Sequence, residues 1–386
     1  MPAGDRGVID RVVDRALHTV STPRPHHPTL AALDLHARVP VVDLLVGTPL
    51  FRRTFLEPAH AGHVDLPRLH AGGVRLVGMS LATRFPDARG TLSAVQFASL
   101  GIPMRALHSD LSLVVRLAAR VDAWASASGG AFVVVRSDAD LARVLAPGGP
   151  VGAFIGVQGG QVLGDDSALL PAVARRLRLV GVRMLAPAHV MDNPLAGSGT
   201  GRRAGGLTAL GRLAVGELER AGIVVDLAHA SSRTIADTLA IASIPPVLSH
   251  TGFVERAGAR SRWRRYSAAS RNVRVADARG VARAGGVVGV TTAVSLLGGG
   301  TLAGLVDTIR FAIDELGADH VAIGSDMDGA LRSVIDASGL PLVTDGLLAG
   351  GVPEADVVAL LGGNALRVLR PVLVRAGDSP ASRPGL

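Results

Sequence analysis

Short apolar runs rich in valine and isoleucine alternate with amphipathic segments along most of the chain. Apolar runs without polar alternation are typical of strands in a parallel sheet that is covered on both faces. The pattern predicts eight such strands: Val39–Val46, Val74–Ala82, Gly152–Gln158, Val182–His189, Ile223–His229, Pro246–His250, Val287–Thr292 and His320–Asp326. A ninth run, Phe132–Arg136, predicts a short additional strand within a connection.

The segments between these runs have the spacing of helices with one apolar face. The predicted helices are Pro103–Ala127, Ser167–Val180, Leu207–Ala221, Ser231–Ala242, Leu302–Leu316, Pro353–Leu361 and Ala365–Val374. Eight βα repeats in one chain, with no linker rich in proline or serine, predict an α/β fold that is a single closed (β/α)8 TIM barrel. A doubly wound open sheet is the alternative, but no GxGxxG motif follows the first strand.

The ends of the chain differ in composition from the repeats. We expect one domain over residues 31–374, a poorly ordered segment over residues 1–30 and a flexible tail over residues 375–386. The 386 residues include no cysteine, which excludes disulfides, thiolate zinc sites and a cysteine nucleophile. The chain shows neither an apolar signal-peptide core nor an uncharged apolar stretch of membrane-spanning length, so we expect a cytoplasmic protein without a membrane partner.

The net charge of +8 raises the question of nucleic-acid binding. The densest basic stretch, Arg256–Arg274, holds seven arginines but has Trp263 and Tyr266 as its only aromatic residues. No zinc-finger, helix-turn-helix or RNA-binding signature accompanies it. The stretch therefore favours a solvated loop, and nucleic-acid binding is the weaker alternative.

Polar, metal-capable residues end several of the predicted strands. His189, His229, His250 and Asp326 each stand at the carboxyl end of an apolar run. In a (β/α)8 barrel these strand ends meet at one rim, where the chemistry of such barrels is found. A single histidine there is commonly structural, but three histidines with an aspartate predict a site suited to a divalent metal ion. The segment Asp34–His36 also holds an aspartate and a histidine, but it precedes the first predicted strand and is interpreted as structural.

Several ordered blocks carry a family resemblance. They are VDLPRLHAGGVRLVGMSLA, IGVQGG, GLTALGRLAVGELERAGIVVDLAHAS, VLSHTGF, SRNV, ARAGGVVGV, HVAIGSDMDG and LLGGNALRVL. Together they resemble the membrane (renal) dipeptidase family of zinc peptidases over roughly Ala31 to Leu373. The resemblance implies a (β/α)8 barrel that hydrolyses dipeptides with two zinc ions.

The resemblance also implies roles for individual residues. His229 and His250 match the two histidines of the second metal, and Asp326 matches the aspartate that meets the first metal and the attacking water. His189 matches the histidine that stabilises the tetrahedral oxyanion. Arg271 matches the arginine that binds the substrate carboxylate, a pairing that suits a bidentate guanidinium.

Three positions depart from the family pattern. The first strand of the family ends in Asp-x-His-x-Asp, whereas here Leu45 replaces the histidine and Gly47 replaces the second aspartate. Gln158 replaces the glutamate that bridges the two ions. With Asp326 as the one remaining carboxylate, two zinc ions would leave an excess positive charge that costs several kcal/mol. The sequence therefore predicts at most one zinc ion, or none.

These observations favour a dipeptidase-like barrel whose activity is lost or much reduced and which binds a small carboxylated ligand or a dipeptide. A mononuclear zinc dipeptidase or amidohydrolase that uses His229, His250 and Asp326 is the first alternative, and a nucleic-acid-associated protein is the second. A homodimer is an assembly that the sequence allows. The triple change Leu45→His, Gly47→Asp, Gln158→Glu should restore binding of two metal ions. Asp328 is interpreted as a loop residue or a helix cap.

Overall fold

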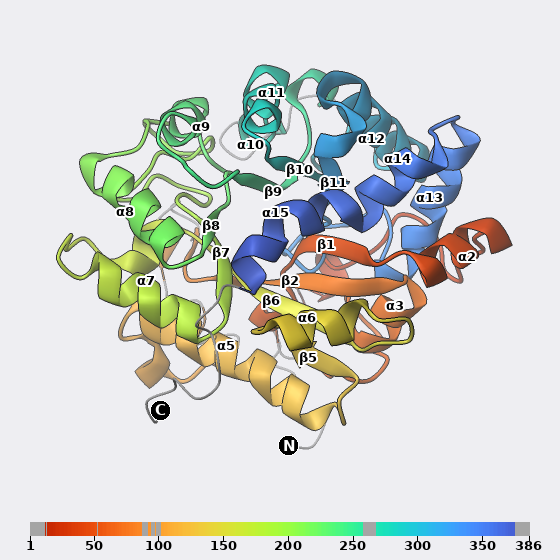
Figure 1. Ribbon diagram of the computed structural model, residues 1–386, viewed down its shortest axis with the longest axis horizontal. Helices are drawn as coiled ribbons and strands as arrows, with labels where there is room; N and C mark the ends of the chain where they lie inside the picture. Colours follow the sequence, from red (N-terminus) through yellow and green to blue (C-terminus); the bar gives the residue numbers. More distant parts are fainter. Residues whose placement is uncertain are drawn as a thin grey trace.

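Eight parallel strands form a closed barrel in the computed structural model, which describes residues 12, 14–51, 53–86, 92–93, 97, 102–257 and 268–374 (Figure 1). The strands are β1 (Val41–Val46), β2 (Val74–Ala82), β6 (Val151–Gln158), β7 (Val182–Ala186), β8 (Val224–Val225), β9 (Val247–Thr251), β10 (Val287–Val290) and β11 (Val321–Ile323). Their order around the barrel is β1-β2-β6-β7-β8 and then β9-β10-β11, with β11 pairing to β1. A bridge between Asp226 and Val247 joins β8 to β9 and closes the ring.

Each of the eight strands expected from the apolar runs is present, so the predicted TIM barrel is confirmed. The ninth run forms β5 (Phe132–Val134), which pairs with β6 as an additional strand. Several strands end earlier than predicted; β11, for example, ends at Ile323. His189, His229 and Asp326 therefore stand in the loops just after the strands, whereas Gln158 and His250 lie within β6 and β9.

Helices surround the barrel, as Figure 1 shows. They are α2 (Leu30–Arg38), α3 (Leu66–Ala71), α5 (Asp110–Ala127), α6 (Asp138–Leu145), α7 (Leu170–Leu179), α8 (Ala209–Arg220), α9 (Ser232–Leu239), α10 (Ala268–Arg271), α11 (Val275–Arg283), α12 (Leu302–Leu316), α13 (Leu340–Ala349), α14 (Glu354–Val358) and α15 (Asn364–Leu373). Hydroxyl side chains cap many of their first turns; Ser231 accepts from Thr234 N at the start of α9, and Thr301 accepts from Gly304 N at the start of α12. Between the predicted helices Pro353–Leu361 and Ala365–Val374, a π-helical turn (Ala359–Gly363) runs directly into α15.

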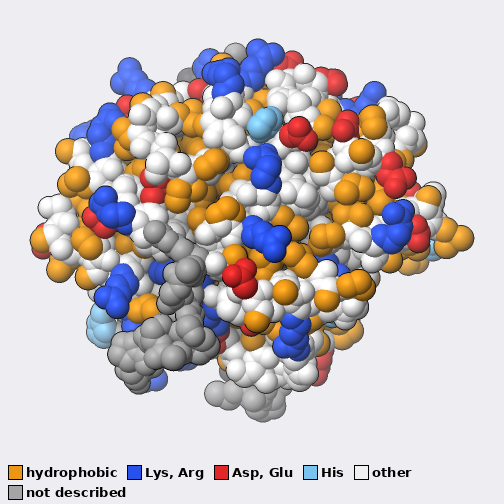
Figure 2. Space-filling view, viewed as in Figure 1, with side chains coloured by type: hydrophobic (Ala, Val, Ile, Leu, Met, Phe, Trp, Pro, Cys, Tyr) orange, Lys and Arg blue, Asp and Glu red, His pale blue; other side chains and the backbone are white. Residues whose placement is uncertain are grey.

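Helix α15 closes the amino-terminal end of the barrel. Its buried Val368, Leu369 and Val372 pack in one apolar cluster with Val42 of β1 and Val247 of β9. In the face that Figure 2 shows, apolar and charged side chains are interspersed over the surface. Among the described residues, no helix has the length and apolar character needed to cross a bilayer.

Residues 14–30 are held by contacts with the rest of the chain. From residue 14 onward this segment packs on the barrel, where Asp14 and His18 are buried. Ser21 N donates to Ser333 O (3.0 Å) and Thr22 N donates to Val334 O (2.9 Å), so this segment extends along the chain that follows β11. These main-chain hydrogen bonds compensate for a composition with few apolar residues. Residues 1–11 and the predicted tail, residues 375–386, lie outside the described part of the chain.

Candidate functional site

A cavity of about 230 Å³ lies at the carboxyl ends of the barrel strands, and we refer to it as the mouth cavity. It is lined by Leu45, Gly47, Leu50, Ser80, Ala82, Gln158, His189, Val190, His229, His250, Asp326, Gly329 and Ala330. The structure thus brings the candidate ligands and the three replaced positions around one space. Arg271, at the end of α10, is adjacent, and its Nη2 donates to the carbonyl oxygen of His250 (3.0 Å).

Three histidine rings lie next to one another along one side of the mouth cavity. The Nε2 atoms of His229 and His250 are 3.1 Å apart, and the rings of His189 and His229 meet edge to face with centroids 4.5 Å apart. Burial lowers the pKa of His229 and His250 well below the ordinary value, and the nearby Arg271 guanidinium lowers it further. Both rings are therefore neutral at physiological pH, and one donates its Nε2 proton to the other.

Asp326 stands across from the histidines. Its Oδ2 lies 3.9 Å from His250 Nε2, which is longer than a hydrogen bond. Burial raises the pKa of Asp326 to about 7, against the opposing effect of Arg271. Burial and Arg271 also lower the pKa of His189, to about 3. The mouth cavity thus combines neutral imidazoles, one titratable carboxyl group and a guanidinium.

The backbone of two site residues is strained. His229 has φ 68° and Asp326 has φ 57°, which is the left-handed region that costs a non-glycine residue about 1–2 kcal/mol. Hydrogen bonds hold both residues in place: Gly199 N donates to His229 O (2.8 Å) and Asp326 N donates to Leu45 O (3.0 Å). Strain of this kind persists where the surroundings fix the conformation, as they commonly do at functional sites.

Asp226, directly behind the histidines, was not among the residues that the sequence singled out. Its Oδ1 accepts from Ala228 N and Ser249 N, both at 2.9 Å. Its Oδ2 accepts from Gln158 Nε2 (3.0 Å) and from Ser249 Oγ (2.6 Å), and Ser249 Oγ lies 2.7 Å from His250 Nδ1. The signal in the sequence was position, because Asp226 and Ser249 lie in the same apolar runs as His229 and His250.

Gly47 is in close contact with the loop that follows β11. A Cβ atom at this position would lie 2.5 Å from the carbonyl oxygen of Asp328 and 2.8 Å from its carbonyl carbon. Gly47 N also donates to Met327 O at 2.7 Å, which holds the two segments together. Any side chain at position 47 therefore requires the backbone at Asp328 to move.

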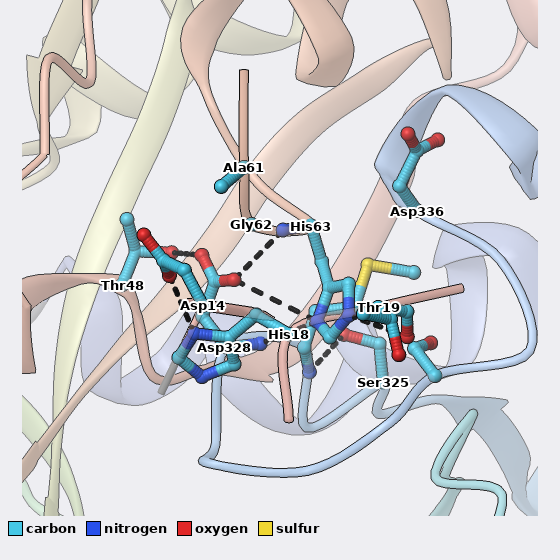
Figure 3. Close-up of polar contacts among 12 residues, drawn as sticks. Asp14, His18, Thr19, Thr48, Ala61, Gly62, His63, Ser325, Asp328 and Asp336 are labelled. Carbon is cyan, nitrogen blue, oxygen red and sulfur yellow. Dashed lines mark hydrogen bonds and ion pairs between the residues drawn. The ribbon is translucent and has the colours of Figure 1, made fainter. Parts of the chain in front are cut away.

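Asp328 lies in a turn of the loop after β11, in agreement with its interpretation as a loop residue, and it is also the centre of a buried ion-pair cluster (Figure 3). Its Oδ1 accepts from Arg53 Nη1 (2.9 Å) and His63 N (2.8 Å), and its Oδ2 accepts from Thr48 Oγ1 (2.9 Å). Burial alone would raise the pKa of Asp328, but Arg53, together with His18 and His63, lowers it to about 2. The carboxylate is therefore ionised and fully paired.

The amino-terminal segment completes this cluster. Asp14 Oδ1 lies 2.6 Å from Arg53 Nη2 and 2.9 Å from His18 Nδ1. His18 Nε2 accepts from Ala330 N (3.2 Å), so the segment is bonded to the loop that lines the mouth cavity. Figure 3 shows Asp14 and His18 beside Asp328. The cluster fixes the position of this loop and thereby its approach to Gly47.

The structural interpretation of the Asp34–His36 segment agrees with its contacts. His36 Nδ1 lies 2.8 Å from Gly72 O, and its Nε2 lies 2.7 Å from Thr344 Oγ1. Neither of these partners lines the mouth cavity. Across the described ranges, no group of three or more histidine, aspartate or glutamate side chains is arranged to hold a metal ion.

A comparison with protein families shows to which family the chain is related. Residues 30–382 match the profile of the membrane dipeptidases, peptidase family M19. The chain belongs to the membrane dipeptidase family. This family member is 29% identical over 358 residues to the dipeptidase verJ of Clonostachys rogersoniana, a match that covers 88% of this chain and 85% of that protein. It is 28% identical to the dipeptidase tcpJ of Claviceps purpurea, over 84% of this chain and 72% of that protein.

Solved structures of a probable dipeptidase and of a metallopeptidase share the fold of this chain. The probable dipeptidase PvdM from Pseudomonas aeruginosa superposes with a TM-score of 0.72 at 21% identity, covering 89% of this chain and 98% of that one. A metallopeptidase from Rhodobacter sphaeroides, solved with a phosphinate mimic of the dipeptide L-Ala-D-Ala, gives a TM-score of 0.67 at 23% identity, covering 86% and 99%. The family resemblance expected from the ordered sequence blocks is confirmed.

Proposed function

We propose that this membrane dipeptidase family member binds a dipeptide or another small carboxylated ligand in the mouth cavity. In this proposal it does not assemble the two-zinc centre implied for its family, so its dipeptidase activity is lost or much reduced. Dipeptide hydrolysis is the reaction of the family. The observation that carries the proposal is the contact between Gly47 and Asp328, because backbone occupies the space of a ligand side chain.

Two further observations support the loss of the two-ion site. Leu45 is 2% exposed and belongs to an apolar cluster, so the position expected to supply a histidine ligand carries hydrocarbon. Gln158 uses its amide group to donate to Asp226, and a neutral amide is a poor bridge between two cations. The residues present therefore do not fit two adjacent zinc ions, and we derive no hydrolytic step through them.

The proposed ligand follows from Arg271. Its Nη1 is buried and has no hydrogen-bond partner within the described residues, while Nη2 is bonded to His250 O. A buried guanidinium nitrogen without a partner is costly unless a ligand supplies an acceptor, and a carboxylate is the matching group. The Rhodobacter sphaeroides relative was solved with a dipeptide mimic, which makes a dipeptide the first ligand to test.

A second candidate function is a hydrolase with one zinc ion on His229, His250 and Asp326. The distance of 3.1 Å between the two Nε2 atoms favours it, since two nitrogens at about 2.0–2.1 Å from one tetrahedral zinc ion lie roughly 3.3 Å apart. In this candidate, dipeptide turnover requires about one zinc ion per chain and disappears in His229→Ala.

Calorimetry with L-Ala-D-Ala, combined with detection of released alanine, tests the proposal. We expect saturable binding without release of alanine, and a roughly tenfold to hundredfold loss of affinity in Arg271→Met, as for a hydrogen bond to a charged group. Arg274→Met, at an exposed position three residues further on, is the matched control and should bind as the wild type does. Turnover of L-Ala-D-Ala by the wild type, or unchanged binding in Arg271→Met, would contradict the proposal.

A further inference from the structure

A short loop after β11 forms one wall of the mouth cavity, and we refer to its residues 328–331 as the lid. Gly329 and Ala330 of the lid line the cavity. The backbone is anchored on both sides of the lid: the carbonyl oxygens of Met327 and Arg332 accept at 2.7 Å and 2.9 Å from backbone N–H groups in the loops after β1 and β10. Any movement of the lid is therefore confined to the residues between these two anchors.

The backbone of the lid has a conformation that its own residues do not favour. Asp328 has φ 60° and Ala330 has φ 61°, both in the left-handed region. An aspartate side chain can bond to nearby backbone in this conformation, but alanine has no group that could do so. Such a conformation persists where contacts from outside fix it. The lid is therefore held closed by its surroundings.

The amino-terminal segment supplies some of these contacts, and we refer to residues 14–22 as the strap. His18 Nε2 accepts from Ala330 N (3.2 Å), which is a direct hydrogen bond between strap and lid. Thr19 O accepts from Ser333 N (3.0 Å), so the strap also lies along the chain that follows the lid. The strap thus bonds both the lid and the segment to which the lid is anchored.

The strap also covers the ion pair that holds Asp328 (Figure 3). Arg53 Nη1 lies 2.9 Å from Asp328 Oδ1, and Arg53 Nη2 lies 2.6 Å from Asp14 Oδ1 in the strap. The side chains of Arg53 and Asp328 are 1% and 0% exposed. An ion pair that is kept from water is stronger than the same pair in contact with water. Release of the strap would expose Arg53 and weaken its hold on the lid.

The strap is attached to the barrel mainly through polar groups. Asp14 and His18 are buried on its inner side, whereas Arg15, Ala16 and Leu17 are exposed. None of its residues belongs to the apolar clusters that the described residues form. Segments with few buried apolar contacts are the ones that open locally while the rest of a protein stays folded. The strap can therefore detach without unfolding the barrel.

We propose that the strap keeps the lid closed over the mouth cavity, and that detachment of the strap lets the lid move away from Gly47. A ligand that contacts Gly329 and Ala330 then favours the closed lid and the attached strap, and this part of the inference rests on the proposed function. Coupling of this kind is reciprocal, so a detached strap lowers the affinity for the ligand.

Amide hydrogen exchange of the ligand-free, full-length protein tests the inference, with short peptides read by mass spectrometry. His18→Phe removes the acceptor of Ala330 N–H and retains a ring that can pack against Phe51, where the ring centroids are 4.6 Å apart. We expect exchange in the lid to become about tenfold faster, as for the loss of one hydrogen bond, with unchanged exchange in β1 and β11.

His36→Phe is the matched control for this variant. His36 and His18 are both 3% exposed, and both rings are bonded through their two nitrogens, but the partners of His36 are Gly72 O and Thr344 Oγ1. Lid exchange in His36→Phe should equal that of the wild type. Unchanged lid exchange in folded His18→Phe, or an equal increase in all barrel strands, would overturn the inference.

If His18→Phe does not fold, Asp14→Asn replaces it, since it removes the charge beside Arg53 and keeps the shape of the side chain. Faster exchange in the lid is again the expected result, and exchange equal to that of the wild type would refute the role of the strap.

The ligand provides a second and separate measurement. L-Ala-D-Ala at about ten times its Kd should slow exchange in the lid about tenfold, because binding stabilises the closed state. The N–H groups of Ser21 and Thr22, which bond Ser333 O and Val334 O, should be slowed with it. Slower exchange in the lid alone would refute the coupling of strap and lid. A wild-type protein that does not bind L-Ala-D-Ala contradicts the proposed function instead, and the ligand-free comparison then decides whether the strap holds the lid.

Discussion

The carbonyl oxygen of Asp328 would lie 2.5 Å from a Cβ atom on Gly47. The family resemblance implies an aspartate ligand at the position of Gly47; in the structure, this position is a point where two backbone segments meet. The loop that carries Asp328 is held there by a buried ion pair with Arg53 and by the amino-terminal segment. The packing of this loop therefore leaves no room for a side chain at position 47.

The contact predicts that Gly47→Ala is destabilising. The methyl group forces the backbone at Asp328 to shift, and overpacking of this kind costs about 1–3 kcal/mol in the free energy of unfolding. Gly205→Ala is the control, since a Cβ atom there meets nothing within 4 Å. Urea denaturation of both variants compares the two positions, and equal stabilities would show that the loop yields easily.

The triple change Leu45→His, Gly47→Asp, Gln158→Glu should not restore a two-metal site, contrary to the expectation from the sequence alone. The Asp side chain meets the backbone of Asp328, and the Glu side chain meets the carboxylate of Asp226. We expect a destabilised protein that takes up fewer than two zinc ions per chain, measured by elemental analysis. Binding of two ions by a stable variant would show that the loop opens to admit them.

Gln158→Glu alone should make stability depend on pH. Burial and Asp226 raise the folded-state pKa of the new carboxyl above its unfolded value of about 4.3. The folded state then binds more protons, so the penalty is absent below about pH 4 and grows to roughly 3 kcal/mol as pH rises. Denaturation at pH 4 and pH 7 measures this difference, and adding Asp226→Asn should reduce the penalty at pH 7 to the part that burial alone causes. A penalty that is equal at both pH values would contradict the argument.

The cluster at Asp328 predicts a large effect of Arg53→Met. Removing the guanidinium leaves Asp328 and Asp14 buried without their cation, which costs about 3–5 kcal/mol at neutral pH. The folded pKa of Asp328 is about 2, below the unfolded value of about 3.9, so its stabilising contribution is present above pH 4 and declines as pH falls through 2.

Without Arg53 the pKa of Asp328 rises, so the difference between wild type and variant should shrink at pH 3. Guanidinium denaturation at pH 7 and pH 3 measures it. Arg38→Met removes an ion pair with Asp34 at the surface and should change stability little. A difference that does not change with pH would place the effect in packing and not in charge.

The sequence predicted the barrel well because each strand is a separate apolar run of the expected length. The runs that end at Gln158, His250 and Asp326 contain strands β6, β9 and β11. Gln158 and His250 lie within their strands, and Asp326 lies in the loop directly after β11. The polar residues at these ends could be predicted to converge, since parallel strands in a barrel share one rim. Gln158, His250 and Asp326 all line the mouth cavity, which agrees with that expectation.

The parts that could not be predicted depend on contacts between distant segments. Arg53 pairs with Asp328, which lies more than 270 positions away in the sequence, and Asp14 pairs with Arg53 in the same cluster. No local pattern in the sequence predicts such pairings. The left-handed backbone at His229 and Asp326 is another example, because aspartate and histidine adopt a positive φ only at some positions and the sequence does not mark which. Residues 14–30 depend on distant segments in the same way, because hydrogen bonds and buried charges hold them to the barrel.

Zinc stoichiometry tests the central claim most directly. Protein purified without chelators and titrated with zinc should bind at most one ion per chain, because backbone at Asp328 and hydrocarbon at Leu45 occupy the first position. Two zinc ions bound tightly to the wild-type chain, with both lost in His250→Ala, would contradict this account of the mouth cavity.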